Sequence, residues 1–135
     1  AEPGSPEPLL YHEPCHTPMK AAGSDRVLAK LFGAPPRQVP YCCGEAGTMS
    51  LSRPDISETI RDRKTLLIES AESRNDDLIL TACPSCVQGL SRSRRETGLA
   101  AKHVAVYAAE RFLGERWKRE FLREIKKRGR ETILF

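Results

Sequence analysis

Short apolar runs and longer segments with helical spacing alternate along the chain. Residues 78–82, Leu-Ile-Leu-Thr-Ala, form a continuous apolar run typical of a strand buried on both faces. Shorter runs predict strands at residues 9–12 and 103–106. Segment 39–41 is a weaker candidate because Pro40 has no N–H to donate, but its position between two helices favours an extended segment.

Helical spacing fills the segments between these strands. Capping residues followed by apolar residues at intervals of three and four predict helices over residues 24–32, 52–74 and 85–95. The helix over 52–74 is the longest, and its buried face is expected to consist of Ile56, Ile60, Leu67 and Ala71.

The C-terminal part continues the pattern with helical turns at residues 108–113 and a final helix that begins at Trp117. Residues 132–135 are expected to add an edge strand. Strands that alternate with helices predict an α/β fold, with a mostly parallel sheet of about four strands and helices on both faces.

Composition fits a single globular domain. The chain has 135 residues, of which 39% are hydrophobic and 30% charged, and no apolar run approaches the roughly 20 residues that span a bilayer. We therefore expect no transmembrane segment. Residues 1–8 are rich in proline and lack the regions of a signal peptide, so we expect a linker there and one domain over 9–135, cut from a larger protein.

The net charge of +4 is unevenly distributed. Residues 1–109 carry thirteen basic and thirteen acidic side chains, so the whole excess lies in the final helical region. Acidic residues are interleaved there at a spacing that supports a helix through ion pairs. A solvated basic face is the simpler interpretation, and nucleic acid is a disfavoured partner.

The five cysteines form one ordered pattern, C-x26-CC-x39-C-x2-C. They are Cys15, Cys42, Cys43, Cys83 and Cys86. An odd number without a secretion signal disfavours a disulfide framework, so reduced thiols are expected. Each group follows a predicted strand, and the carboxyl ends of parallel strands meet at one edge of a sheet. The sequence therefore predicts that the three groups converge on one site.

Thiolates are soft ligands that suit zinc or an iron–sulfur cluster. Zinc needs four tetrahedral ligands, and the pair Cys42-Cys43 leaves one thiol more than that, which a cluster of several irons can use. An iron–sulfur site is thus favoured and zinc is the alternative. Thiol–disulfide exchange at Cys83-Pro84-Ser85-Cys86 is weaker because it leaves the other cysteines unexplained.

Residues around the cysteines suit such a site. Gly44 and Gly47 permit close approach of the backbone to a cofactor, and their amides can donate to sulfur. His12 and His16 flank Cys15 as candidate ligands or donors, although a histidine near a strand end is more often a structural polar group. Other candidates are the loop residues Glu13 and Glu45 as proton carriers, although such glutamates are usually solvated.

Three motifs resemble a known family. Tyr-His-Glu-Pro-Cys-His at 11–16, Cys-Cys-Gly-Glu-Ala-Gly-Thr at 42–48 and Cys-Pro-Ser-Cys at 83–86 resemble the cysteine-rich CCG domain. That domain is found in heterodisulfide reductase, in the iron–sulfur proteins of glycolate and lactate oxidation systems and in a succinate:quinone oxidoreductase. The chain looks most similar to the C-terminal domain of bacterial FAD-linked iron–sulfur oxidoreductases, although its first gap, of 26 residues, is shorter than usual.

The resemblance implies a metal site on the five cysteines, holding either a [4Fe–4S] cluster, non-cubane in some relatives, or zinc on a subset of them. It also implies partners: a flavin dehydrogenase domain or subunit that carries FAD, other iron–sulfur domains, and an acceptor such as a quinone or a disulfide. The expected location is the cytoplasm, peripheral to the membrane through partners. No flavin or substrate motif is present, so catalysis by this domain alone is not expected.

Overall fold

The computed structural model describes residues 9–45, 48–70 and 78–132 of the chain. The predicted linker, residues 1–8, lies outside the described residues, and so do 133–135 of the predicted edge strand. The chain divides into two compact units, Ala1–Val104 and Ala105–Phe135. Each unit is described by itself.

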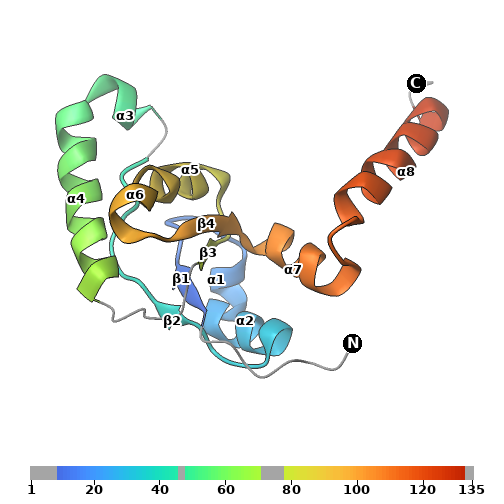
Figure 1. The fold of residues 1–135 in the computed structure, drawn as a ribbon, viewed down its shortest axis with the longest axis horizontal. Coiled ribbons are helices and arrows are strands. Elements are labelled where there is room, and N and C mark those ends of the chain that lie inside the picture. Colours follow the sequence, from blue (N-terminus) through green and yellow to red (C-terminus); the bar gives the residue numbers. More distant parts are fainter. Residues whose placement is uncertain (1–8, 46–47, 71–77, 133–135) are drawn as a thin grey trace. The chain divides into compact units, whose positions relative to one another are not determined.

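The first unit is built on a four-stranded parallel sheet (Figure 1). Its strands are β1 (Leu10–His12), β2 (Arg37–Gln38), β3 (Leu78–Thr81) and β4 (Ala100–His103), in the spatial order β2-β1-β3-β4. The chain therefore winds from β1 to one side, then returns to the other side of β1. This reversal creates a topological switch point between β1 and β3, where open α/β sheets bind their ligands.

Helices connect the strands, as the alternating pattern predicts. In the first unit they are α1 (Met19–Ala22), α2 (Ser24–Phe32), α3 (Met49–Ser52), α4 (Pro54–Ser70), α5 (Pro84–Arg92) and α6 (Arg94–Thr97). Pro54 and Pro84 each occupy the first position of a helix, where the missing N–H costs nothing. The prediction of an α/β fold with a parallel sheet is confirmed.

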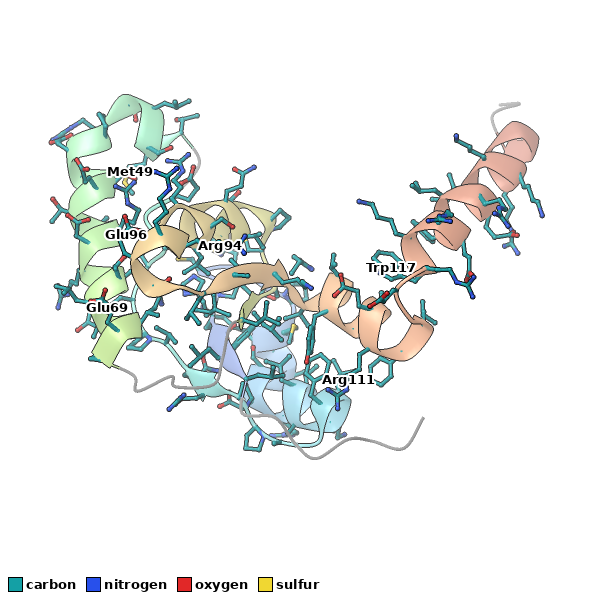
Figure 2. The ribbon with its side chains drawn as sticks, in the orientation of Figure 1. Met49, Glu69, Arg94, Glu96, Arg111 and Trp117 are labelled. Atoms are coloured by element: carbon teal, nitrogen blue, oxygen red, sulfur yellow. The ribbon has the colours of Figure 1, made fainter. Side chains whose placement is uncertain are left out.

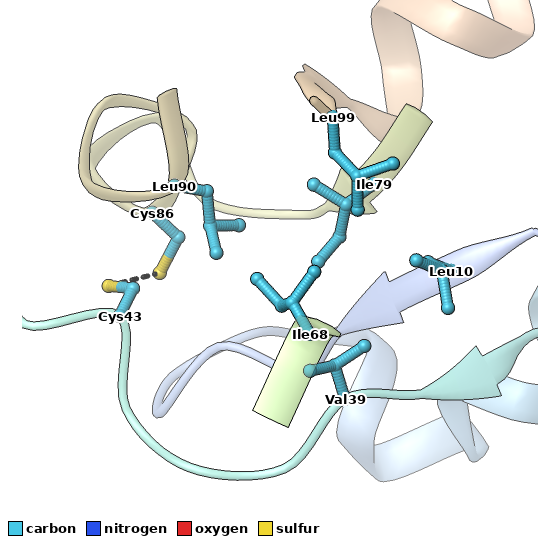
Figure 3. Close-up of a cluster of buried hydrophobic side chains, with 8 residues drawn as sticks. All are labelled: Leu10, Val39, Cys43, Ile68, Ile79, Cys86, Leu90 and Leu99. Atoms are coloured by element: carbon cyan, nitrogen blue, oxygen red, sulfur yellow. Dashed lines mark hydrogen bonds between the residues drawn. The ribbon is translucent and has the colours of Figure 1, made fainter. Parts of the chain in front are cut away.

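The core lies on both faces of the sheet. Leu10 and Ile79 are paired in register and pack on one face with Ile68 of α4 and Leu90 of α5 (Figure 3). The alternate residues Tyr11 and Leu80 point to the opposite face because side chains alternate along a strand. They are fully buried, as is Leu28 of α2, and Phe32 of the same helix is buried as well.

Two predicted strands are displaced. The second strand is Arg37–Gln38 rather than 39–41, because Val39 donates the last ladder bond, to the Tyr11 carbonyl at 2.8 Å, and Pro40 has no N–H. The fourth strand is Ala100–His103 rather than 103–106, because Ala100 pairs with Leu78 and Val104 begins a helix.

Helix boundaries and faces also differ from expectation. The predicted helix over 85–95 is divided at Ser93 into α5 and α6. The face predicted for the helix over 52–74 is only partly buried: Ile56 is exposed, Ile60 and Leu67 are half-buried, and Ala71 lies outside the described residues. The buried residues of α4 are Ser57, Lys64 and Ile68. The buried face of α4 is thus rotated from the predicted one. It includes Lys64 because this side chain forms hydrogen bonds in the interior.

The second unit consists mainly of α7 (Val104–Leu113) and α8 (Trp117–Thr132). Trp117 lies in the first turn of α8, with its ring centroid 6.2 Å from that of Phe121 (Figure 2). Glu124 pairs with Lys127 and Arg128 at 3.7 Å, so the interleaved charges support the helix as predicted. α8 ends at Thr132, so this first residue of the predicted edge strand is helical, and the other three residues lie outside the described part of the chain.

Among the residues described, no helix combines the length and apolarity needed to cross a membrane.

Candidate metal centre

The three cysteine segments follow the carboxyl ends of three strands. Cys15 lies in the loop after β1, the pair Cys42-Cys43 lies beyond β2, and Cys83 follows β3 and caps α5. The strand order brings these ends to one edge, around the switch point between β1 and β3.

The thiols of Cys43 and Cys86 are in direct contact. Both are buried, and their Sγ atoms lie 3.3 Å apart (Figure 3). A disulfide would bring them to about 2.05 Å, whereas two thiolates on one zinc ion at about 2.3 Å lie roughly 3.8 Å apart. The pair is therefore reduced, and its spacing is close to that of two ligands of one metal. This donor set fits a soft metal.

The other three cysteines are electrostatically linked to this pair or to one another. The charge of Cys83 acts on Cys86, and that of Cys15 acts on Cys42. Burial raises the pKa of Cys42, while the Gly44 amide, 3.4 Å from its Sγ, opposes that shift. Cys15 is exposed, and Cys83 is half-buried. Among the described residues, the structure thus brings Cys43, Cys86 and His12 within 4.8 Å of one another, while Cys15, Cys42 and Cys83 lie outside this group.

The contact between the two buried thiols shifts their pKa values in opposite directions. The hydrogen bond between the two Sγ atoms lowers the pKa of Cys43 well below its usual range, and His12 acts in the same direction. The same hydrogen bond, followed by burial, raises the pKa of Cys86. Cys43 is therefore the thiol of the pair that ionises more readily, and the thiolate is the form that binds metals.

Comparison with known proteins agrees with this arrangement. The model of the CCG family, described as a cysteine-rich domain, matches residues 9–91. The chain belongs to the CCG family. Its matched region contains all five cysteines and ends inside α5.

Several curated relatives share similarity with this chain. It is 27% identical to one subunit of the fumarate reductase (CoM/CoB) of Methanothermobacter marburgensis, over 67% of its own length and 19% of the relative's. It is 33% identical to the glycolate oxidase iron-sulfur subunit of Escherichia coli and 25% identical to one subunit of a heterodisulfide reductase of Methanosarcina barkeri, in each case over 64% of the chain and 22% of the relative.

The chain therefore spans about a fifth of the length of these relatives. No solved structure matches it significantly.

Close backbone packing holds the CCG loop, residues 42–45, in place. Gly44 has φ 79°, a conformation that favours glycine, and its carbonyl accepts a 2.7 Å hydrogen bond from Ser57 of α4. Gly89 of α5 faces the same loop: a Cβ there would lie 2.9 Å from the Cys43 carbonyl oxygen. The glycine that weakens α5 on propensity grounds thus lets the loop approach the helix.

Glu45 anchors the other side of the loop. Its carboxylate is buried and accepts hydrogen bonds from Arg92 of α5 at 3.0 Å and from Ser50 of α3 at 3.1 Å. Glu45 is therefore not the solvated loop residue that its sequence position suggests. Its paired carboxylate has a structural role that the sequence does not reveal.

Lys64 is the site residue that sequence reasoning missed. It lies in the middle of α4 and is 1% exposed, with its Nζ 3.0 Å from His12 Nδ1. Burial lowers its pKa to about 8, while the charges of Cys43, Cys42 and Cys86 oppose that shift. No motif marks it, because its partners lie in distant segments.

The remaining candidates are separated by their surroundings. His12 is buried with a ligand atom within 4.8 Å of those of Cys43 and Cys86, whereas His16 is exposed. One carboxylate oxygen of Glu13 is buried and lacks a hydrogen-bond partner within the described part of the chain. Gly47 lies outside the described residues.

Proposed function

We propose that this CCG domain holds an iron–sulfur cluster and passes electrons within a larger flavin-linked oxidoreductase. The observation that carries the proposal is the buried Cys43–Cys86 pair, 3.3 Å apart at the switch point, in a family whose named relatives include iron–sulfur subunits. The cluster is proposed as a [4Fe–4S] cluster of the non-cubane type, because five thiols exceed the four ligands of a zinc site or of a cubane cluster.

The proposed ligands are the five cysteines: Cys15, Cys42, Cys43, Cys83 and Cys86. When bound, an iron–sulfur cluster supplies one-electron chemistry. The protein holds the thiolates and directs the Gly44 amide to a sulfur, and it shields the inner pair from water. The exposed Cys15 side is the face from which a partner can approach.

The chain spans only about a fifth of the length of its relatives, so we propose that further domains or subunits act together with it. A flavin dehydrogenase domain or subunit that carries FAD would supply electrons, alone or through other iron–sulfur domains. A quinone or a disulfide would accept them. The domain itself has no substrate-binding motif, so we propose transfer of electrons rather than catalysis by this unit alone, at a cytoplasmic site.

Metal analysis tests the proposal. Protein produced without oxygen and supplied with iron and sulfide should be brown and contain several irons and sulfides per chain. One zinc per chain and no colour under the same conditions would favour the alternative, a structural or docking domain.

A variant series then tests the ligand set. Cys43→Ala should abolish cluster uptake because it removes one of the five thiolates, whereas a four-cysteine zinc site could survive this change. Ser85→Ala is the matched control, since Ser85 is exposed within the same Cys83–Cys86 segment. Retention of the full iron content by Cys43→Ala would rule out a five-thiolate site.

A further inference from the structure

Lys64 is buried in an unusual way. Lysine is almost never fully buried unless paired, yet this side chain is 1% exposed. Its Nζ lies 2.6 Å from the carbonyl oxygens of Val39 and Pro40, 3.1 Å from that of Tyr41 and 3.0 Å from His12 Nδ1. Four acceptors thus surround the three hydrogens of one ammonium group.

These contacts fix the backbone that leads into the cysteine pair. Three successive carbonyls turn toward one Nζ atom, which requires the chain to curl just before Cys42. Tyr41 has φ 70°, and within the described ranges it is the non-glycine residue with positive φ. Such a conformation persists only when the surroundings hold it, and Lys64 is the group that gathers the three carbonyls.

The same contact fixes the tautomer of His12. An ammonium group has no lone pair, so Nδ1 must accept and the ring proton lies on Nε2. A neutral imidazole in this state can donate but offers no free nitrogen to a metal. His12 is therefore a hydrogen-bond donor toward Cys43 rather than a ligand, despite its position within 4.8 Å of both buried thiols.

The ammonium charge also needs a counter-charge. All four hydrogen-bond partners of Lys64 are neutral, and no carboxylate among residues 9–45, 48–70 and 78–132 forms an ion pair with it. A buried charge is costly unless it is balanced. The negative charge that acts on it comes from the cysteines of the site, chiefly from Cys43, whose pKa is lowered.

We propose that Lys64 is the positioning residue of the metal centre. Its ammonium group clamps the backbone before the cysteine pair and supplies a buried positive charge that balances the thiolate ligands. This inference rests on the proposed metal site and deepens it. The clamp keeps the pair in place, and the charge favours the reduced, more negative state of a bound cluster.

Metal-free protein provides the first test, with Co²⁺ as a probe of thiolate sites. Lys64→Met removes the charge and the donors, whereas Lys64→Gln keeps an amide donor without charge. Both should bind Co²⁺ at least tenfold more weakly than the wild type, as expected for loss of a group that orients ligands. Lys30→Met is the matched control, because it makes the same chemical change at an exposed position of α2.

The reduction potential of iron-loaded protein provides the second test. The neutral variants should have a more negative midpoint, by at least tenfold in the reduction equilibrium, or about 59 mV for one electron. Wild-type Co²⁺ affinity in Lys64→Gln would overturn the proposal, as would an unchanged midpoint. If neither neutral variant folds, Lys64 serves the fold alone and the proposal is wrong.

The two proposals fail separately. A wild-type protein that takes up no iron–sulfur cluster contradicts the proposed function, and the Co²⁺ comparison still decides the role of Lys64. A wild type that loads iron alongside neutral variants with equal affinity and midpoint contradicts the role of Lys64 alone.

Discussion

At the scale of single residues, the candidate site requires a residue without a side chain where α5 packs against the CCG loop. Gly89 lies where α5 meets the CCG loop, and a methyl group added there would be 2.9 Å from the Cys43 carbonyl oxygen and 3.1 Å from the Glu45 Cβ. Both atoms belong to a loop that is anchored on several sides, so neither can move easily.

Gly89→Ala should therefore destabilise the protein. Alanine favours a helix by about 1 kcal/mol over glycine, but overpacking costs about 1–3 kcal/mol, and displacing Cys43 should also weaken metal binding. Chemical denaturation and Co²⁺ titration measure the two effects. Gly129→Ala in α8 is the control: a Cβ there has no atom within 4 Å, so this variant should be neutral or slightly more stable. A Gly89→Ala protein with greater stability and unchanged Co²⁺ affinity would refute the contact.

At the scale of elements, ion pairs around the CCG loop and the helices differ in their burial. Arg92 of α5 pairs with Glu45, whose side chain is 8% exposed, while the Arg53–Asp55 pair beside α4 is more than half exposed on both sides. Exposed pairs contribute little because water and salt screen them, whereas a buried carboxylate depends on its partner.

Arg92→Ala should lower the free energy of unfolding by about 1 kcal/mol, a value discounted for the partial exposure of Arg92. The loss should persist at high salt, because the buried Glu45 is left with Ser50 alone as the partner identified for its side chain in the described part. Arg53→Ala is the control and should have little effect. Equal effects of the two variants in urea denaturation would contradict a structural role for Glu45.

Elements with strong local signals could be predicted from the sequence. The apolar run at 78–82 and the periodic segment at 24–32 correspond to β3 and α2, because local pattern and tertiary environment agree there. The strand predicted at 103–106 is misplaced because β-branched residues favour it locally, while pairing with β3 selects Ala100–His103.

In the candidate site too, features with a local sequence signal could be predicted, and features that depend on distant segments could not. The approach of Cys43 to Cys86 could be predicted, because strand alternation places the loops after parallel strands at the same edge of the sheet. Lys64 could not, because a lysine in a polar helix carries no sign of three carbonyls and a histidine supplied by other segments. The role of Glu45 is hidden for the same reason: its partner, Arg92, is 47 residues away.

At the scale of the whole molecule, the chain contains two units but a single candidate site among the residues described. The family model ends at residue 91, and the sheet, the cysteines and Lys64 all belong to the unit Ala1–Val104. In the second unit, Phe121 and Ile125 of α8 are exposed. The domain predicted over 9–135 thus extends beyond the family match and beyond the unit that contains the candidate metal ligands.

A fragment of residues 1–104 should fold and bind Co²⁺ with the affinity of the full chain, because every proposed ligand and the groups that hold it are retained. Loss of the basic, partly apolar α8 should leave the metal centre unchanged, since the charges that act on its thiolates come from the first unit. Circular dichroism and Co²⁺ titration provide the measurements. A second fragment that ends at Leu113 keeps all of α7 and protects the test against damage at Val104, which is buried. If both fragments fold but bind the metal weakly, residues beyond 113 contribute to the centre, and a domain over 9–135 is the correct unit.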